Sequence, residues 1–458
     1  MQNIRDLYNE LTTLNIGVQV VEDNLEVFFE ENTENIKEYL ALIKENKIGL
    51  LDFLSRRKKN LNDIPLSPAQ RNILFKCLQG ESSSYNMSRI FKVDESLCDL
   101  EKIKDIFNCI VSRHEALRMK LLNKNGKYFF IVDNDFRSID VFNDIDYSLV
   151  TDYVYTPFEL EENLVKLGVF KNKNETFLCL VLHHIVGDDK SMAIIQKNFL
   201  NFMNGVPEDE ALTEHFTDYL TYLQNEKDGI NKSKDFWIAK MLDIKKNARH
   251  SFNIRSKNGT PISESRYFSF KLNTSIQRNL FPRIIASLSY SIKDVFNNSY
   301  SIFTVPFSTR EILSHHDQVG YYINQLPLGI DCSKHQIEDL IIDIRNEIFE
   351  YNDHKLYPFS SIMSGISIPP GLFNMSIILL NEIAENTIDH RFEAVKSEVI
   401  QNVQLKNDLV FEFLYDEHAI SLTLHVEYNS NFMSTINLEN LINKFYEYVL
   451  QTESRSNT

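Results

Sequence analysis

The sequence lacks long apolar runs, and this absence narrows where the protein can work. No stretch approaches the ~20 consecutive apolar residues of a membrane-spanning helix, so we expect no membrane association. The N-terminus, MQNIRD, lacks the order of basic and then apolar residues that marks a signal peptide. We therefore expect a cytoplasmic protein.

Positive charge and paired cysteines are also scarce. The chain carries 48 Lys and Arg against 64 Asp and Glu, a net charge of -16, which argues against nucleic-acid binding. Its five cysteines include no CxxC pair, so they are expected to be reduced and mostly packed thiols. The sequence also has neither a GxxxxGKS/T phosphate-binding loop nor a GxSxG hydrolase turn.

The composition itself is that of a globular protein. The chain has 458 residues, 43% of them apolar and 24% charged, which is material for about three domains. Residues 103–118 and 438–450 have amphipathic helical patterns, and residues 422–428 alternate as a strand does. Residues 359–373 contain Gly365 and a Pro-Pro-Gly run, which predicts a loop that crosses between domains. The mixture favours an α/β fold.

Residues 177–203 contain the strongest candidate site. The apolar run 177–182 predicts a buried strand, followed at once by His183 and His184, a turn at Gly187 and a helix over 190–203. This order places an imidazole at the edge of a sheet, where it faces a cleft. Asp188 is placed to orient the turn or to pair with a cation. Two adjacent histidines do not share a helix face as an i, i+4 metal-binding pair does, so no metal site is predicted.

The first 58 residues form a separate small unit. Apolar residues recur at helical spacing over 4–14, and two strands follow at 18–21 and 25–29. Two further helices are predicted, the first around 36–43 and the second over 48–54. A unit this small has a thin core, which is typical of a module that binds a partner.

A series of motifs in the remaining chain resembles the condensation domains of nonribosomal peptide synthetases. The motifs occur in the family's order and span about residues 62–455; they are 66–70 (LSPAQ), 113–118 (RHEALR), 157–160 (PFEL), 183–188 (HHIVGD), 319–324 (VGYYIN), 357–359 (YPF) and 427–429 (EYN). The resemblance implies two chloramphenicol-acetyltransferase-like lobes in a V-shaped pseudo-dimer with a tunnel between them. The lobes would be residues 62–230 and 231–458.

The resemblance also implies the chemistry. Condensation domains join a carrier-bound acyl thioester to a carrier-bound or free amine. The substrates arrive on the phosphopantetheine arms of donor and acceptor carrier proteins, and no cofactor is tightly bound. His184 would act on the amine, either as proton acceptor or as positioning group. His183, Asp188 and Arg310 would support it, with Arg310 matching the arginine that pairs with the family's aspartate across the lobes.

Three residues are candidates to line the tunnel. Asn324 and Tyr322 match a tunnel motif, although core packing is an equal alternative for Tyr322. Asp189 stands where the family usually has glycine; it could cap the following helix, narrow the tunnel or mark lost activity. Two other functions therefore stay open: an inactive recruitment module, and an acyltransferase acting on an alcohol or a small free amine.

Residues 1–58 resemble the TubC-type N-terminal docking domain of these synthetases, a small α+β unit. In that family the hairpin binds the C-terminal tail of an upstream synthetase subunit as an added strand. The residues expected to bind the tail are Val20, Val21, Leu25, Val27 and Phe28. The alternative is a capping subdomain that packs on the main body.

Overall fold

The computed structural model of the protein describes most of the chain. The described residues are 4–14, 16–21, 24–29, 35–51, 63–94, 98–133, 139–143, 148–172, 175–206, 212, 215–248, 262–273, 279–313, 316–333, 336–364, 366, 372–381, 392–394, 407–416 and 419–454. Across these ranges, no helix combines the length and the apolar character needed to cross a membrane.

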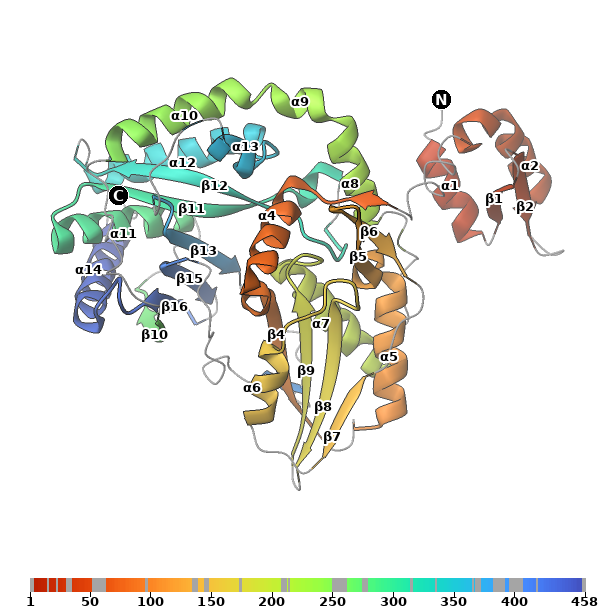
Figure 1. Cartoon of the computed structure of the whole chain (residues 1–458), viewed down its shortest axis with the longest axis horizontal. Helices are drawn as coiled ribbons and strands as arrows, with labels where there is room; N and C mark the ends of the chain where they lie inside the picture. Colours follow the sequence, from red (N-terminus) through yellow and green to blue (C-terminus); the bar gives the residue numbers. More distant parts are fainter. Residues whose placement is uncertain are drawn as a thin grey trace.

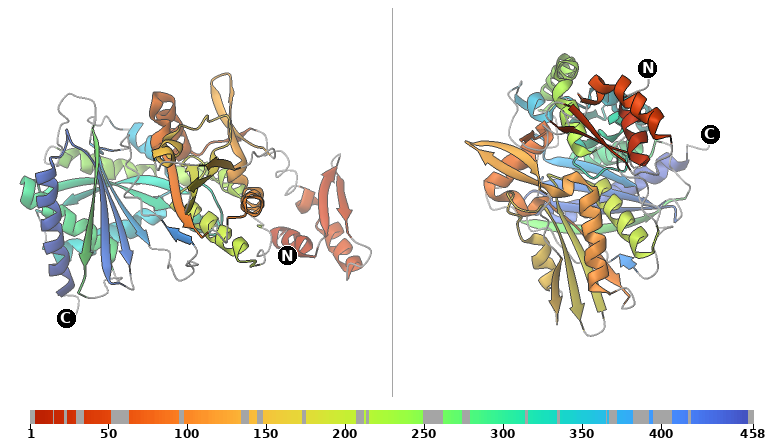
Figure 2. Two further views of the ribbon diagram at one scale, coloured as in Figure 1. Left: turned by 90° about the horizontal axis from the view of Figure 1, so that it is seen from below. Right: turned by 90° about the vertical axis from the view of Figure 1, so that its right-hand side faces the viewer.

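The N-terminal unit has its own small core. It contains α1 (Ile4–Thr13), β1 (Gly17–Val21), β2 (Asn24–Phe28), α2 (Ile36–Glu45) and a helical stretch at 47–51. The order of helix, hairpin, helix and helix is the predicted one. Its buried residues are Leu7, Leu11, Ile16, Val18, Ile43 and Leu50. Figure 1 and the left view of Figure 2 show this unit beside the much larger body of the chain.

The first lobe is built on a mixed five-stranded sheet. The sheet has the order β14-β4-β9-β8-β7. The residues from 178 to 183 in β9 are all buried, as befits a central strand. Helices α5 and α7 contact each other, and α6 contacts β4 and β9. The elements are β4 (Asn86–Val93), α5 (Leu100–Arg113), β7 (Asp140–Asn143), α6 (Ser148–Tyr155), β8 (Val165–Asn172), β9 (Glu175–His183) and α7 (Asp189–Met203).

Shorter elements frame this lobe. A second sheet, β3-β6-β5, lies beside α4, whose Ser67 and Gln70 form a reciprocal capping box. Helices α8 and α9 lead towards the second lobe (Figure 1). The elements are β3 (Ile64–Pro65), α4 (Pro68–Lys76), a π-helical turn (Cys77–Glu81), 3-10 turns (Ser82–Tyr85 and Glu115–Arg118), β5 (Met119–Lys124), β6 (Lys127–Val132), α8 (Phe216–Asn225) and α9 (Lys227–Asn231).

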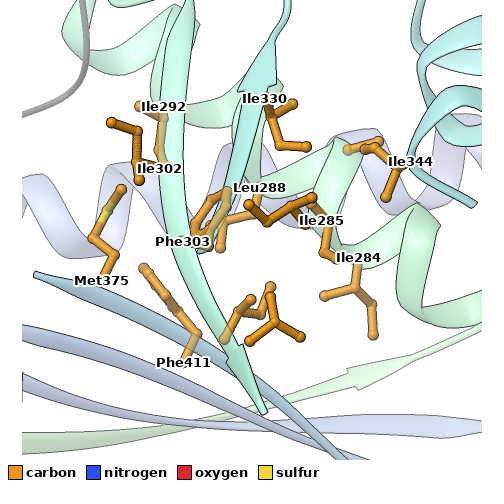
Figure 3. Close-up of a cluster of buried hydrophobic side chains, with 14 of the residues drawn as sticks. Ile284, Ile285, Leu288, Ile292, Ile302, Phe303, Ile330, Ile344, Met375 and Phe411 are labelled. Carbon is orange, nitrogen blue, oxygen red and sulfur yellow. The ribbon is translucent and has the colours of Figure 1, made fainter. Parts of the chain in front are cut away.

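The second lobe has a hydrophobic core of its own. Its sheet has the order β10-β16-β15-β13-β11-β12, and α11 contacts both α12 and α14. Isoleucines and leucines of α11 pack against β11, β12 and β13, as Figure 3 shows. The elements are α10 (Lys234–Asn247), β10 (Ser263–Lys271), α11 (Leu280–Phe296), β11 (Tyr300–Ser308), a 3-10 turn (Arg310–Leu313), β12 (Ile323–Asp331), α12 (Ile337–His354), α13 (Phe359–Ser364), β13 (Met375–Asn381), β15 (Leu409–Asp416), β16 (Ser421–Asn429) and α14 (Thr435–Ser454).

A strand pairing and several buried side chains join the two lobes. The strand β14 (Phe392–Ala394), which follows β13 in the chain, pairs antiparallel with β4 of the first lobe. Val319, Tyr321 and Tyr322, which precede β12, are buried in the core of the first lobe. The α/β class is thus observed, while the V shape and the predicted domain boundaries stay predictions.

Two local predictions need correction. Residues 359–364 form the helix α13 and not a loop; Pro358 stands just before it, where the fixed φ of proline suits a helix start, and Ile362 is buried. The predicted helix over 103–118 ends earlier, at Arg113. The helix ends because His114 has extended backbone angles (φ -110°, ψ 110°), and a 3-10 turn follows it. The buried His114 ring stays on the core side of α5, with its Nε2 3.1 Å from Nδ2 of Asn198.

Candidate active site

The turn between β9 and α7 carries the two histidines. β9 ends at His183, and α7 begins at Asp189 after the N-cap residue Asp188. Gly187 lies so close to Leu182 that an added Cβ would stand 2.4 Å from its Cδ2. A side chain at position 187 would therefore clash with Leu182, which is fully buried.

His184 is half-buried and held on three sides. Its backbone N–H donates to the carbonyl of Tyr85 at 2.7 Å. Its Nδ1 lies 2.8 Å from the carbonyl of Gly187, so Nδ1 carries the hydrogen and the lone pair of the neutral ring is on Nε2. The ring of Tyr321 meets the imidazole edge-on, with centroids 5.3 Å apart. The neutral ring is thus held in the tautomer that can accept a proton at Nε2.

His183 is fully buried and serves the turn itself. Its Nδ1 accepts a hydrogen bond from the backbone N–H of Ile185 at 3.2 Å, and its Nε2 lies 3.6 Å from Sγ of Cys77. The rings of Tyr85 and Phe158 flank it. These contacts give His183 the position of a structural support for its neighbour.

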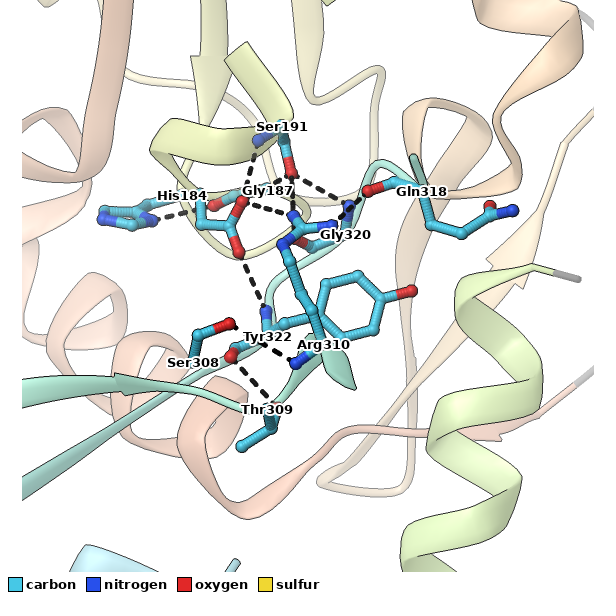
Figure 4. Close-up of polar contacts among 10 residues, drawn as sticks. His184, Gly187, Ser191, Ser308, Thr309, Arg310, Gln318, Gly320 and Tyr322 are labelled. Atoms are coloured by element: carbon cyan, nitrogen blue, oxygen red, sulfur yellow. Dashed lines mark hydrogen bonds and ion pairs between the residues drawn. The ribbon is translucent and has the colours of Figure 1, made fainter. Parts of the chain in front are cut away.

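Asp188 is the centre of a buried polar cluster that joins the lobes. Figure 4 labels its partners Ser191, Arg310 and Tyr322. Its Oδ1 accepts from the backbone N–H and the hydroxyl of Ser191, both at 2.8 Å, and from Nη2 of Arg310 at 2.5 Å. Its Oδ2 accepts from the backbone N–H of Tyr322 at 3.2 Å. One carboxylate therefore caps α7 and binds two groups that follow β11 in the chain.

Arg310 completes this cluster from the second lobe. Its Nη2 also donates to the hydroxyl of Ser191 and the carbonyl of Gly320, and its Nη1 donates to the carbonyl of Gln318. The guanidinium lies over the ring of Tyr322, 4.4 Å from the centroid. We call Asp188, Ser191, Arg310 and Tyr322 the clamp, because together they hold the histidine turn against the second lobe.

Asp189 lies outside the clamp, in the first turn of α7. Its Oδ1 is 3.8 Å from Nη2 of Arg89 on β4, and both side chains are more than 40% exposed. The suggestion that Asp189 caps the helix is wrong, since the capping carboxylate belongs to Asp188. A carboxylate in the first turn does interact favourably with the positive end of the helix dipole.

A pocket of about 280 Å³ opens where α4, α8, α9 and α13 meet; we call it the junction pocket. Asn324 lines it and donates from Nδ2 to the carbonyls of Lys355 and Tyr357. Tyr321 lines it too, and burial raises the pKa of its phenol, so the ring stays neutral. Tyr322 is instead fully buried between Phe216 and the guanidinium of Arg310, which is the core position left open for it.

Three residues of the site were not predicted as site residues from the sequence. Ser191 joins Asp188, Arg310 and Gly320, and its place three residues after a capping aspartate was a usable signal. Gln70 caps α4 and donates from Nε2 to the carbonyl of Ile185 at 2.7 Å. Tyr321 had no signal that separated it from Tyr322. Within the part of the chain that the structure describes, no three His, Cys, Asp or Glu side chains gather as a metal site would require.

A comparison with protein-family models gives a match over most of the chain. The model described as "Condensation domain" matches residues 60–457. The chain belongs to the condensation-domain family. This is the condensation domain of nonribosomal peptide synthetases, as the motifs indicated; residues 1–59, which include nearly all of the N-terminal unit, lie outside the match.

Relatives of known sequence are large synthetases. The condensation domain is similar to surfactin synthase subunit 2 of Bacillus subtilis (strain 168), with 23% identity over 416 residues, 84% of this chain and 11% of that one. It is also similar to gramicidin S synthase 2 of Aneurinibacillus migulanus, with 22% identity over 373 residues, 76% of this chain and 8% of that one. The match thus covers about a tenth of the length of these relatives.

Solved structures share the fold at low identity. The X-domain from teicoplanin biosynthesis matches with a TM-score of 0.70 and 14% identity, over 86% of this chain and 96% of that one. The starter condensation domain of rhizomide synthetase matches with a TM-score of 0.68 and 13% identity, over 85% and 96%. The epimerization domain from the third module of tyrocidine synthetase B gives 0.66 and 14%, over 85% and 96%.

Proposed function

We propose that this condensation domain forms an amide bond between an acyl thioester on a donor carrier protein and an amine that is carrier-bound or free. The observation that carries the proposal is the fixed tautomer of His184. Its Nδ1–H donates to the carbonyl of Gly187, so the neutral imidazole holds a basic lone pair on Nε2.

The reaction needs only proton handling and positioning. The amine nitrogen attacks the thioester carbonyl, the C–N bond forms, the C–S bond breaks, and the thiolate takes up the proton that the amine loses. His184 accepts that proton or orients the amine by a hydrogen bond, an effect of about 10²–10⁴-fold for a general base. The clamp holds the turn in place, which favours reaction between two tethered substrates.

A reconstitution experiment tests this proposal. Donor and acceptor carrier proteins loaded with aminoacyl thioesters are mixed with wild-type protein, and the carrier-bound amide is measured by intact-protein mass spectrometry. We expect product with the wild type and a loss of about 10²-fold or more with His184→Ala. An unchanged yield with His184→Ala would remove the histidine from the mechanism. Product formed on a free alcohol, which is an ester and not an amide, would favour the acyltransferase.

A second function, noncatalytic recruitment, is favoured by one residue. Asp189 places a charged side chain at the start of α7, where the family usually has glycine, and Arg89 lies beside it. A side chain there would obstruct a phosphopantetheine arm that passes over the turn. Absence of product from every carrier pair, with carrier binding intact, would support recruitment over catalysis.

We also propose that the N-terminal unit docks an upstream synthetase subunit through its hairpin. Among the described residues, β1 and β2 pair only with each other, so each strand keeps one edge for an added strand. Leu25 and Val27 pack against the core of the unit, whereas Phe28 is 51% exposed. Val20 and Val21 lie in β1, opposite Leu25 and Asn24.

Binding of C-terminal tail peptides from candidate upstream subunits tests the docking proposal. Fluorescence anisotropy should show binding to the full chain and none after deletion of residues 1–58. Phe28→Ser should weaken binding, while Ile342→Ser, which removes an exposed apolar side chain from α12, should not. Tail binding that survives the deletion would refute docking by this unit and favour a capping subdomain.

A further inference from the structure

The lining of the junction pocket is positively charged, in contrast to the acidic chain as a whole. The described residues around it include Arg71, Lys227 and Lys355 and no aspartate or glutamate. The chain as a whole carries a net charge of -16. A pocket with only cations in so acidic a protein attracts anions locally, against the charge of the whole chain.

Two of the three cations lack a carboxylate partner. Arg71 donates from Nη1 to the carbonyl of Leu66, and the described residues offer neither Arg71 nor Lys227 an ion pair. Glu226 and Asp228 flank Lys227 in the sequence, yet neither lines the pocket. Lys355 differs, because it is buried and pairs with Glu311, and burial lowers its pKa. Among the described residues, no carboxylate therefore compensates the charges of Arg71 and Lys227 at the pocket.

The rest of the lining suits a ligand with an apolar body. Leu220, Leu223, Ile230 and Leu356 line the pocket, and burial raises the phenol pKa of Tyr219 and Tyr321, so neither adds negative charge. The volume, about 280 Å³, is close to the lower end of the ~300–1,000 Å³ of small-molecule sites. Tyr321 also meets the ring of His184, so a bound ligand lies one aromatic ring from the candidate catalytic residue.

We propose that the junction pocket binds the anionic group of a slender substrate, with Arg71 and Lys227 as its counter-ions. The anion has two chemical sources in this reaction: the phosphate of a phosphopantetheine arm, or the carboxylate of a free amino-acid acceptor. The proposal rests on the proposed function for the identity of these sources. Anion binding is measured without amide formation. One experiment can therefore refute the anion site without refuting the proposed function, and the reverse also holds.

Calorimetric titration of the full chain with two matched pairs of probes tests the proposal. The first pair is 4′-phosphopantetheine and pantetheine, which differ by the phosphate. The second is leucine and leucinamide, which differ by the carboxylate. We expect the anion of one pair to bind at least tenfold more tightly than its partner, and the pair that shows the difference identifies the source.

Matched variants locate the binding site. Arg71→Gln and Lys227→Gln should each weaken binding of that anion about tenfold, as expected for loss of a hydrogen bond to a charged group. Lys76→Gln on α4 and Lys232→Gln after α9 remove the same charge from residues that do not line the pocket, and should leave binding unchanged.

Three results would overturn the pocket assignment: no binding of either anion, equal binding within both probe pairs, or equal weakening by the control variants. A protein that binds an anion as expected yet forms no amide would instead refute the proposed condensation. If the protein forms the amide but shows any of the three results, the proposed function is supported and the proposed anion site is refuted.

Discussion

Tyr321 and Tyr322 are neighbours in the chain, yet they belong to two opposite regions of the lobe junction. Tyr322 lies in the clamp, where the carboxylate of Asp188 meets the guanidinium of Arg310 and both are buried. Tyr321 lies at the junction pocket, where Arg71 and Lys227 meet no carboxylate among the described residues. The clamp pairs its two charges, whereas two of the three cations at the junction pocket have no carboxylate partner among the described residues.

The difference separates rigidity from binding. In the clamp, each oxygen of Asp188 accepts from at least one donor, so the charges hold the lobes together and are not accessible to a ligand. In the junction pocket, the same kind of charge is partly exposed and can be neutralised by a substrate. His184 stands between the regions, on a turn that the clamp fixes and beside a tyrosine that lines the pocket.

Breaking the clamp should produce the largest effect. Asp188→Ala or Arg310→Ala leaves one buried charge without its partner, which costs about 3–5 kcal/mol of unfolding free energy. We expect that loss in urea unfolding, together with loss of amide formation. The double variant Asp188→Leu/Arg310→Met should be more stable than either single variant, since no charge remains buried.

An exposed ion pair provides the control for the clamp. Lys444 and Glu447 pair on the surface of α14, and Lys444→Ala should leave the unfolding free energy nearly unchanged, because water and salt screen an exposed ion pair. If Asp188→Ala or Arg310→Ala cost no more than this, the clamp would not be the source of rigidity at the junction.

Alanine variants of the two adjacent histidines should have different effects, His183→Ala on stability and His184→Ala on amide formation. His183→Ala leaves the buried N–H of Ile185 without its acceptor, a cost of about 1–3 kcal/mol in urea unfolding. His184→Ala should change the unfolding free energy much less, because the side chain is only half-buried, and should reduce amide formation about 10²–10⁴-fold. Equal stability losses in the two variants would show that His184 is a structural residue as well.

Acid should weaken the first lobe through His114, which is buried near the clamp. Burial, with Arg113, His215 and Arg310 as further causes, lowers the pKa of His114 to about 3. Its unfolded pKa is about 6.5, so below pH 6.5 the unfolded chain binds a proton that the folded chain does not. The free energy of unfolding therefore decreases as the pH is lowered through this range. From this group alone, it is about 2 kcal/mol lower at pH 5 than at pH 7.

Urea unfolding at pH 7 and pH 5 checks this contribution. The variant His114→Gln should lose about 2 kcal/mol less than the wild type between these two values. His316→Gln, at a loop position, should behave as the wild type does. A wild-type loss that persists in His114→Gln would assign the acid sensitivity to another group.

The sequence predicted the parts of this site that short-range order determines. The strand, the histidines, the glycine turn and α7 follow from local pattern, and the family motifs point to both Asp188 and Arg310. What local pattern does not contain is the pairing of distant segments. Ser191 and Gly320 meet across the lobes, and the separate environments of Tyr321 and Tyr322 depend on which face each side chain presents.

The junction pocket shows the same limit. Arg71, Lys227 and Lys355 look like ordinary surface residues in the sequence, each in a different helix or turn. Only the packing of α4, α9 and the segment after α12 brings them to one pocket. The sequence also does not show which cations have an acidic partner. Acidic residues flank Lys227 in the chain, but they do not line the pocket.

Asp189→Gly should have the smallest effect on stability, and it tests whether the protein is an enzyme or a recruitment module. Its ion pair with Arg89 is long and exposed, worth about 0–1 kcal/mol, and its interaction with the helix dipole adds a similar amount at most. If Asp189 obstructs the substrate arm, the glycine variant should raise amide formation while unfolding changes little. Arg89→Gln removes the same ion pair and leaves the carboxylate, so it should not raise amide formation. A rise in Asp189→Gly alone would mean that the charge beside the clamp restrains an active enzyme, whereas inactivity in all three proteins, with carriers bound, would favour recruitment.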